Sequence, residues 1–232
     1  MRFGRAPRGD AAASFASASR PADEIGWRAA GWCAVDLEMT GLDPRSDEIV
    51  AIGAMPIDEG RIRLGGGLYT LVRASKRSQV GAVLVHKLRL ADVVDAPSLD
   101  DALDHLLAML AGRVPVFHTA AIETAFLGRQ FSRRHVRLPT GADTEALGLR
   151  WLAHRDGTAP PGRGLSLSRL AGALGQPAET PHHALGDALT TAQAFIALAS
   201  LLDTVEPQTV GSLVGAGGDA AGRAAARRFG PG

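Results

Sequence analysis

Two carboxylates stand two residues apart in the segment Trp32-Cys-Ala-Val-Asp-Leu-Glu-Met-Thr40, at Asp36 and Glu38. The apolar residues of the segment alternate with period two and the pattern stops at Gly41, which predicts a β-strand. Because successive side chains of a strand point to opposite faces, the two acids share one face, about 6.6 Å apart. Carboxylates this close repel each other unless they are protonated or bind cations. The pair indicates either a metal site or, as is usual for two such acids alone, a strand face in contact with water.

Two further segments combine histidine with an acid near the start of a predicted helix. In His118-Thr-Ala-Ala-Ile-Glu123, the acid lies in the first turn after a short apolar strand. In Pro181-His-His-Ala-Leu-Gly-Asp187, proline suits the first helical position. Five residues on an ideal helix rotate about 500°, so His182 must approach Asp187 from the preceding loop. Each acid alone has a structural explanation, because a negative charge in the first turn complements the helix dipole.

Taken together and in this order, the three segments resemble the exonuclease motifs of the DEDDh superfamily. This superfamily contains the proofreading epsilon subunit of bacterial DNA polymerase III, RNase T and oligoribonuclease. The resemblance covers residues 30–202 and rests on three motifs, Val35–Gly41, His118–Leu127 and His182–Ala188. Two lesser landmarks, Val85-His86 and Asp143-Thr144, also look similar to the family.

The resemblance implies a role for each motif residue. Asp36, Glu38 and Asp187 correspond to metal ligands, and His182, five residues before Asp187, corresponds to the general base; the adjacent His183 is not the match. The second motif departs from the family, which usually has asparagine and aspartate where this chain has Thr119 and Glu123. Glutamate is one methylene longer, so Glu123 is expected to bind metal through another rotamer or to replace a contact through water.

The implied activity is a metal-dependent 3′-5′ exonuclease that releases nucleoside 5′-monophosphates from single-stranded nucleic acid, with DNA favoured. Two divalent cations, Mg²⁺ or Mn²⁺, would activate the attacking water and clamp the scissile phosphate, and His182 would accept the proton of the water. The enzyme would act alone or as a proofreading partner of a DNA polymerase. Asp36–Pro44 looks especially like oligoribonuclease, so an exoribonuclease of that or the RNase T type is an alternative. A nucleic-acid-binding module impaired by Glu123 is another.

The elements that must position these residues follow from periodicity. Strands are expected over 32–40, 48–57, 61–72 and 114–117, and helices over 98–112, 121–134, 165–174 and 184–202. Three strands followed by alternating helices and strands predict an α/β fold with a mixed central β-sheet flanked by helices, and the resemblance implies the ribonuclease H-like form of it. The exonuclease domain is expected over 29–202, between a flexible arm at 1–28 and a disordered Gly/Ala/Arg-rich tail at 203–232.

The amino-acid composition limits the classes of protein to which the chain can belong. Hydrophobic residues make up 46% of the 232 residues, enough for a sizeable core. The single cysteine excludes an intrachain disulfide, and without a membrane-spanning or export segment a cytoplasmic protein with no membrane partner is expected. Aromatic residues are only 5%, which disfavours an extended base-stacking surface. Arginine outnumbers lysine 23 to 2, and Arg129, Arg133, Arg134 and Arg137 either contact phosphates or form a solvated helix end.

Overall fold

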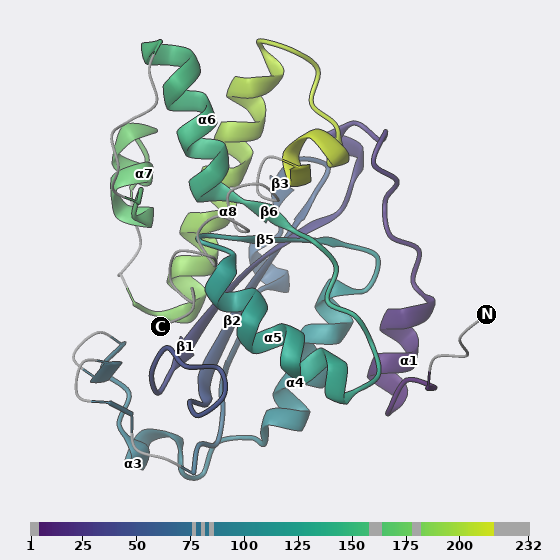
Figure 1. Ribbon diagram of the computed structural model, residues 1–232, viewed down its shortest axis with the longest axis vertical. Coiled ribbons are helices and arrows are strands. Elements are labelled where there is room, and N and C mark those ends of the chain that lie inside the picture. Colours follow the sequence, from purple (N-terminus) through teal and green to yellow (C-terminus); the bar gives the residue numbers. More distant parts are fainter. Residues whose placement is uncertain are drawn as a thin grey trace, which may run out of the picture.

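A computed structural model of the protein describes residues 5–75, 78–79, 82–83, 86–157, 164–177 and 182–215. Its centre is a six-stranded mixed sheet in the order β3-β2-β1-β5-β6, with β4 also paired to β2 (Figure 1). The strands are β1 (Trp32–Met39), β2 (Ile49–Asp58), β3 (Arg61–Ile62), β4 (Leu68–Leu71), β5 (Val114–Phe117) and β6 (Ala142–Asp143). The sheet flanked by helices confirms the predicted ribonuclease H-like α/β fold.

Strand β1 lies in the middle of the sheet and divides the core. It pairs antiparallel with β2, where Asp36 is opposite Gly53, and parallel with β5. Trp32 and Ala34 point to one face and pack among residues of α6, α7 and α8, whereas Val35 and Leu37 point to the other and pack against α4 and α5. Both faces of β1 are therefore buried over most of its length.

The helices cover both faces of the sheet (Figure 1). On one side lie α1 (Asp10–Ser17), α4 (Leu99–Leu110) and α5 (Ala121–Arg133), and on the other lie α6 (Thr144–Asp156), α7 (Leu167–Ala173) and α8 (Ala184–Asp203). The shorter elements are α3 (Leu90–Val93), η1 (Trp27–Ala29) and η2 (Leu64–Gly66). Ser98 caps α4 by accepting a hydrogen bond from the Asp101 amide, as its capping sequence predicts.

The chain outside 29–202 differs from the expectation of an arm and a tail without structure. Helix α1 packs against α4, with Ala12 fully buried and the Phe15 ring 5.5 Å from that of Phe131. After α8, Val210 and Leu213 are fully buried beside the core on the α8 side of the sheet. These apolar residues are too few to produce a periodic pattern, and they are ordered by partners far away in the sequence. Residues 1–4 and 216–232 of the expected arm and tail lie outside the described residues.

Other elements also depart from the sequence expectation, including the short elements α3 and β6, which it lacks. The strand expected over 61–72 is split by η2 into β3 and β4. Helix α6 was absent from the expected elements because two of its buried residues, Ala146 and Gly148, have little or no side chain and leave a weak apolar period.

Helix α8 is the one described helix long and apolar enough to cross a membrane, with a mean hydropathy of 1.4. Half of its most apolar stretch is buried inside the protein, with Phe195 and Leu198 fully enclosed. The apolar composition of α8 is therefore accounted for by packing against the sheet.

Candidate active site

Three of the predicted acids meet where β1 approaches the first turn of α8. Asp36, Glu38 and Asp187 each offer a carboxylate oxygen, and these oxygens lie within 4.8 Å of one another. Asp36 and Glu38 continue the side of β1 that faces α8, as the alternation predicts. Asp187 lies in the first turn of α8. Elements about 150 residues apart in the sequence thus form one compact acidic cluster.

Gly53 explains how α8 comes so close to the sheet. It is the partner of Asp36 on β2, and a Cβ atom at this position would lie 2.1 Å from the Ala184 carbonyl oxygen. No side chain fits in that space, so the main chain at the start of α8 rests directly on β2. Sequence reasoning missed this glycine, because nothing around it in the sequence marks a close approach between distant segments.

Burial and neighbouring negative charges raise the pKa values of Asp36 and Glu38. Burial raises the pKa of Asp36 well above its ordinary value, and the charges of Glu123, Asp187 and Glu38 raise it further. Burial, with the Asp187 charge, raises the pKa of Glu38 to about 7. Among the described residues, no lysine or arginine forms an ion pair with the cluster. The cluster therefore has an excess of negative charge that a bound cation would offset.

Burial also raises the pKa of Asp187, but the main chain counteracts this effect. The His182 amide donates a hydrogen bond of 2.7 Å to Asp187 Oδ2, which favours the ionised carboxylate. His182 has a φ of 63°, in the left-handed region, and lies in the loop before α8 as the five-residue separation requires. His182, in a strained backbone conformation, therefore fixes both the loop before α8 and the carboxylate of Asp187.

Glu123 lies in the first turn of α5, beside this cluster and not within its 4.8 Å group. It is buried, and burial raises its pKa to about 8. Its charge contributes more to the raised pKa of Asp36 than that of any other acid. Its Oε2 atom is buried without a hydrogen-bond partner in the described part of the chain. An unpaired buried oxygen at this place fits a ligand held directly or through water.

The start of α5 is held by Asp143, which caps two helices at once. Its carboxylate accepts hydrogen bonds from the amides of Thr119 at 3.2 Å and Ala120 at 3.0 Å, and from the Glu145 amide at 2.9 Å at the start of α6. The Thr119 hydroxyl donates to Glu145 Oε2 at 2.9 Å. The landmark Asp143-Thr144 therefore fixes the position of Glu123, and Thr119 keeps a structural contact of its own.

The two adjacent histidines have different surroundings. His183 caps α8, with Nδ1 accepting from the Gly186 amide at 3.3 Å, and its ring stacks on Tyr69 with centroids 4.5 Å apart. The His182 side chain is exposed and forms no side-chain hydrogen bond among the described residues. Helix α8 begins at Ala184, so Pro181, expected at the first helical position, precedes it and lies outside the described residues.

His86, from the first of the two lesser landmarks, holds the end of β1. Its Nδ1 accepts from the Leu88 amide at 3.0 Å, so Nε2 carries the proton and donates to the Met39 carbonyl at 3.2 Å. Val85 of the same landmark lies outside the described residues. His86 thus anchors the strand immediately after Glu38.

Comparison with known proteins agrees with this geometry. The sequence model of the exonuclease family RNase_T matches residues 33–195. A DNA polymerase III subunit epsilon-like protein of Rhodobacter capsulatus is 32% identical over 182 residues, which cover 77% of this chain and 25% of that protein. A PolC-type DNA polymerase III of Thermotoga petrophila is 28% identical over 171 residues, covering 74% of this chain and 12% of that protein. The chain thus spans a quarter or less of these relatives.

Solved structures share the fold. Exonuclease X in complex with 5′ overhanging duplex DNA matches with a TM-score of 0.58 and 23% identity, covering 81% of this chain and 99% of that one. E. coli exonuclease I in complex with a dT13 oligonucleotide matches with a TM-score of 0.58 and 18% identity, covering 75% and 41%. Cell-death related nuclease 4 matches with a TM-score of 0.62 and 12% identity, covering 77% and 65%.

Proposed function

The chain belongs to the RNase_T exonuclease family and is a nuclease domain that acts on nucleic acids, and from this premise we propose that it is a metal-dependent 3′-5′ exonuclease. It hydrolyses phosphodiester bonds from the 3′ end of single-stranded nucleic acid and releases nucleoside 5′-monophosphates. The observation that carries the proposal is the compact group of Asp36, Glu38 and Asp187, whose pKa values are all raised. Ionised carboxylates at this distance repel one another, and bound cations offset that repulsion.

Two divalent cations, Mg²⁺ or Mn²⁺, suit this group because its donors are carboxylate oxygens. Asp36, Glu38 and Asp187 would hold them, and the unpaired Oε2 of Glu123 would contribute directly or through a water. When bound, such ions lower the pKa of the attacking water and stabilise the charge on the scissile phosphate.

His182 is the residue that accepts the proton of the attacking water. Its amide is fixed on Asp187, which places the residue next to the acidic cluster, and its ring has no competing hydrogen bond among the described residues. The ring of His183 is occupied by the cap of α8 and by Tyr69. This contrast supports His182 as the general base and assigns His183 to structure.

DNA is the favoured substrate because the relatives are DNA polymerase III proteins and two of the structural neighbours were solved with DNA. The same relatives support proofreading beside a DNA polymerase as the cellular role. We propose the cytoplasm as its location. An exoribonuclease and an impaired binding module remain the alternatives, and the second depends on whether Glu123 supports turnover.

The test is a digestion with Mg²⁺, Mn²⁺ or a chelator, using single-stranded DNA, duplex DNA and RNA labelled at the 5′ end. We expect single-stranded DNA to shorten one nucleotide at a time in the presence of metal, with nucleoside 5′-monophosphate as the product. The Asp36→Asn protein serves as the matched control. Faster digestion of RNA would favour the exoribonuclease, and metal-dependent binding without any product would favour the binding module.

A further inference from the structure

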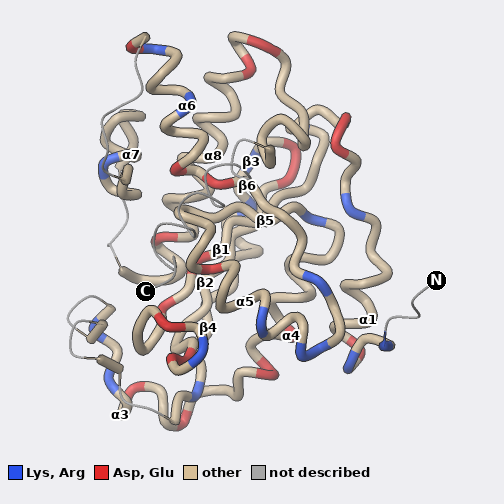
Figure 2. The backbone as a smooth tube through the Cα atoms, in the orientation of Figure 1, with Lys and Arg blue, Asp and Glu red and all other residues tan. Residues whose placement is uncertain are grey.

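Two adjoining depressions lie on the α4 and α5 side of the sheet, away from the acidic cluster. Their volumes are about 290 and 750 Å³, and they share Leu99, Gln130 and Arg133 as lining residues. We call them together the arginine groove, because five exposed arginines line them: Arg8, Arg45, Arg73, Arg129 and Arg133. Figure 2 shows blue Lys and Arg positions along the second half of α5 and near α1, and red acidic positions on β1.

The acids in the arginine groove already have partners of their own. Asp47 accepts from the Thr40 hydroxyl at 3.1 Å and from the Asp43 amide at 2.9 Å. Glu48 accepts from the amide and hydroxyl of Ser75 at 2.8 and 2.7 Å. A third acid, Asp100, pairs with the sixth lining arginine, Arg134, at 2.8 Å, and Arg134 also pairs with Asp104. Arg134 is therefore structural and does not count among the five.

The five exposed arginines have most of their donors available. Among the described residues, none of them forms an ion pair, and the side chains of Arg8 and Arg45 form no hydrogen bond. One guanidinium bond each goes from Arg129 to the Pro44 carbonyl, from Arg73 to the Ala96 carbonyl and from Arg133 to Gln130. Since a guanidinium has about five N–H donors, a ligand rich in acceptor oxygens fits this surface.

The position of the groove relates it to the candidate active site. Arg129 and Arg133 lie six and ten residues after Glu123 on α5, about 9 and 15 Å along the helix axis. Arg45 lies in the loop that follows β1, the strand of Asp36 and Glu38. The groove therefore lies beside the helix whose first turn holds Glu123 and the loop that follows β1.

Resting on the proposed function, we propose that the arginine groove binds the phosphate backbone of the nucleic-acid strand whose 3′ end lies at the acidic cluster. One guanidinium can donate hydrogen bonds to two oxygens of the same phosphate. Five guanidinium groups spread over two adjoining depressions therefore suit a linear chain of phosphates. The few aromatic residues of the chain agree with contacts to the backbone in preference to the bases.

Binding is measured by fluorescence anisotropy with a single-stranded DNA of about 16 nucleotides, in the Asp36→Asn background, which prevents digestion. The groove variant carries Arg45→Gln, Arg129→Gln and Arg133→Gln. The matched control carries Arg61→Gln, Arg63→Gln and Arg155→Gln, three exposed arginines on β3, just after it and at the end of α6. We expect the groove variant to bind about tenfold more weakly than the control variant, with the slope of log K against log salt smaller by about 2.

Hydrolysis of the p-nitrophenyl ester of thymidine 5′-monophosphate separates the groove from the catalytic chemistry. This small substrate has no second phosphate to reach the groove, so we expect its kcat/KM to be the same in wild type and in the groove variant made with Asp36 intact. If the groove and control variants bind the strand equally, the groove proposal is overturned even though the ester is hydrolysed. If wild type hydrolyses neither substrate while the groove variant alone loses binding, the groove stands and the proposed function fails.

Discussion

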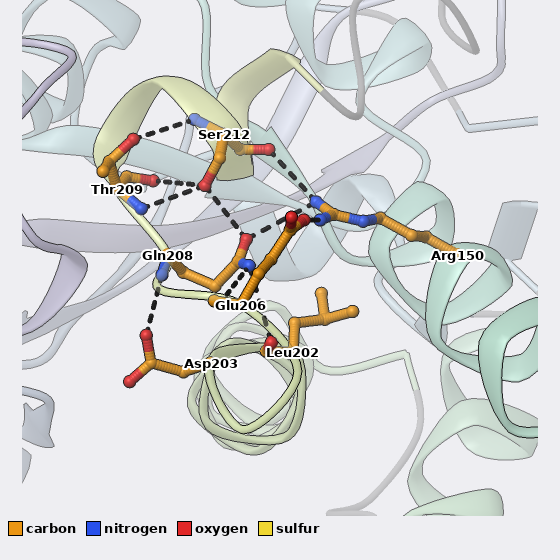
Figure 3. Close-up of polar contacts among 7 residues, drawn as sticks. All are labelled: Arg150, Leu202, Asp203, Glu206, Gln208, Thr209 and Ser212. Atoms are coloured by element: carbon orange, nitrogen blue, oxygen red, sulfur yellow. Dashed lines mark hydrogen bonds and ion pairs between the residues drawn. The ribbon is translucent and has the colours of Figure 1, made fainter.

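At its first turn α8 brings Asp187 against Asp36 and Glu38. Beyond its last turn the chain forms a polar cluster in which each charged group has a hydrogen-bond partner (Figure 3). In that cluster Arg150 donates to Glu206 at 2.5 Å, and Gln208, only 2% exposed, donates from its side chain to the Glu206 carbonyl at 2.8 Å. The remaining groups of the cluster are linked in the same way, with Ser212 Oγ donating to Gln208 Oε1 and the Gln208 amide to Asp203.

The comparison distinguishes two uses of clustered polar groups. Groups with complete partners, as at the end of α8, fix the chain and add stability. Like charges gathered without a described basic partner, as at its start, reduce stability and persist where a ligand compensates them. Helix α8 therefore connects two different regions. The polar cluster after its last turn stabilises the fold, whereas the acidic cluster at its first turn destabilises the fold through charge repulsion.

The largest expected effect comes from removing a charge at the acidic end. Asp36→Asn or Asp187→Asn should lower metal-dependent turnover by about 10³-fold or more, because each substitution removes a charged ligand. The melting temperature of the metal-free protein should stay unchanged or rise, since the repulsion decreases. Turnover with Mn²⁺ and thermal unfolding followed by circular dichroism measure both. Unchanged turnover in either variant would falsify the metal assignment.

The adjacent histidines His182 and His183 at the start of α8 should differ in their effect on turnover. His182→Ala should lower kcat by about 10²- to 10⁴-fold, the usual contribution of a positioned general base. His183→Ala should have a far smaller effect on kcat, because it removes a helix cap and a ring contact. Steady-state kinetics of the two proteins rank them, and a larger effect at His183 would mean that the third motif is aligned one residue off.

Gly53→Ala should break the contact that brings α8 to the acids. The new methyl group would meet the Ala184 carbonyl, so the start of α8 must move, and a displacement of about 1 Å lowers turnover about 10²-fold. The matched control is Gly128→Ala on α5, where a Cβ atom meets nothing within 4 Å. That variant should keep its turnover and gain slightly in melting temperature. Equal turnover in both variants would show that the close approach is dispensable.

The stability of the metal-free protein should depend on pH through the acidic end. Glu38 and Glu123 have pKa values near 7 and 8 in the folded chain and near 4.5 as ordinary groups, so between these values the unfolded chain binds fewer protons. The free energy of unfolding should therefore fall as pH rises from about 5 to 8, by several kcal/mol. Thermal melts across this range measure it. Mg²⁺ or Glu123→Gln should flatten the profile, and a profile that rises with pH would contradict the charge repulsion.

The smallest effect is expected at the matched end. Arg150→Met should lower the free energy of unfolding by about 1 kcal/mol, because Arg150 is partly buried and its partners lose a donor. Turnover should not change. Arg155→Met, which removes an exposed arginine paired with its neighbour Asp156, is the matched control and should have no measurable effect. Denaturant titrations of the two proteins test whether the cluster is structural.

The sequence predicts those parts of this arrangement that short-range patterns encode. Alternation on β1 places Asp36 and Glu38 on one face, and the spacing before Asp187 places His182 in a loop, as the structure has them. Asp187 and Glu123 were assigned by resemblance to a family, because a first-turn acid alone has a structural explanation.

The remaining features depend on contacts between distant segments, which local patterns do not encode. Gly53 is required only because Ala184, from a distant segment, packs against it in the folded chain. Asp143 likewise caps two helices, α5 and α6, that come from different segments. The burial of Ala12 and Leu213 depends equally on partners elsewhere in the chain.

The pairing of Gly26 with Thr209 sets an order of events when the protein is made. The Trp27 amide donates to the Gln208 carbonyl, and Trp27 shares a core with Val210 and Leu213. These partners are 209 − 26 = 183 residues apart, so at about 5 to 20 residues per second the ribosome takes roughly 10 to 40 s between them. Trp27 is therefore synthesised well before the residues that bury it. We expect the contact between the segments around Gly26 and Thr209 to be the last part of the domain to form.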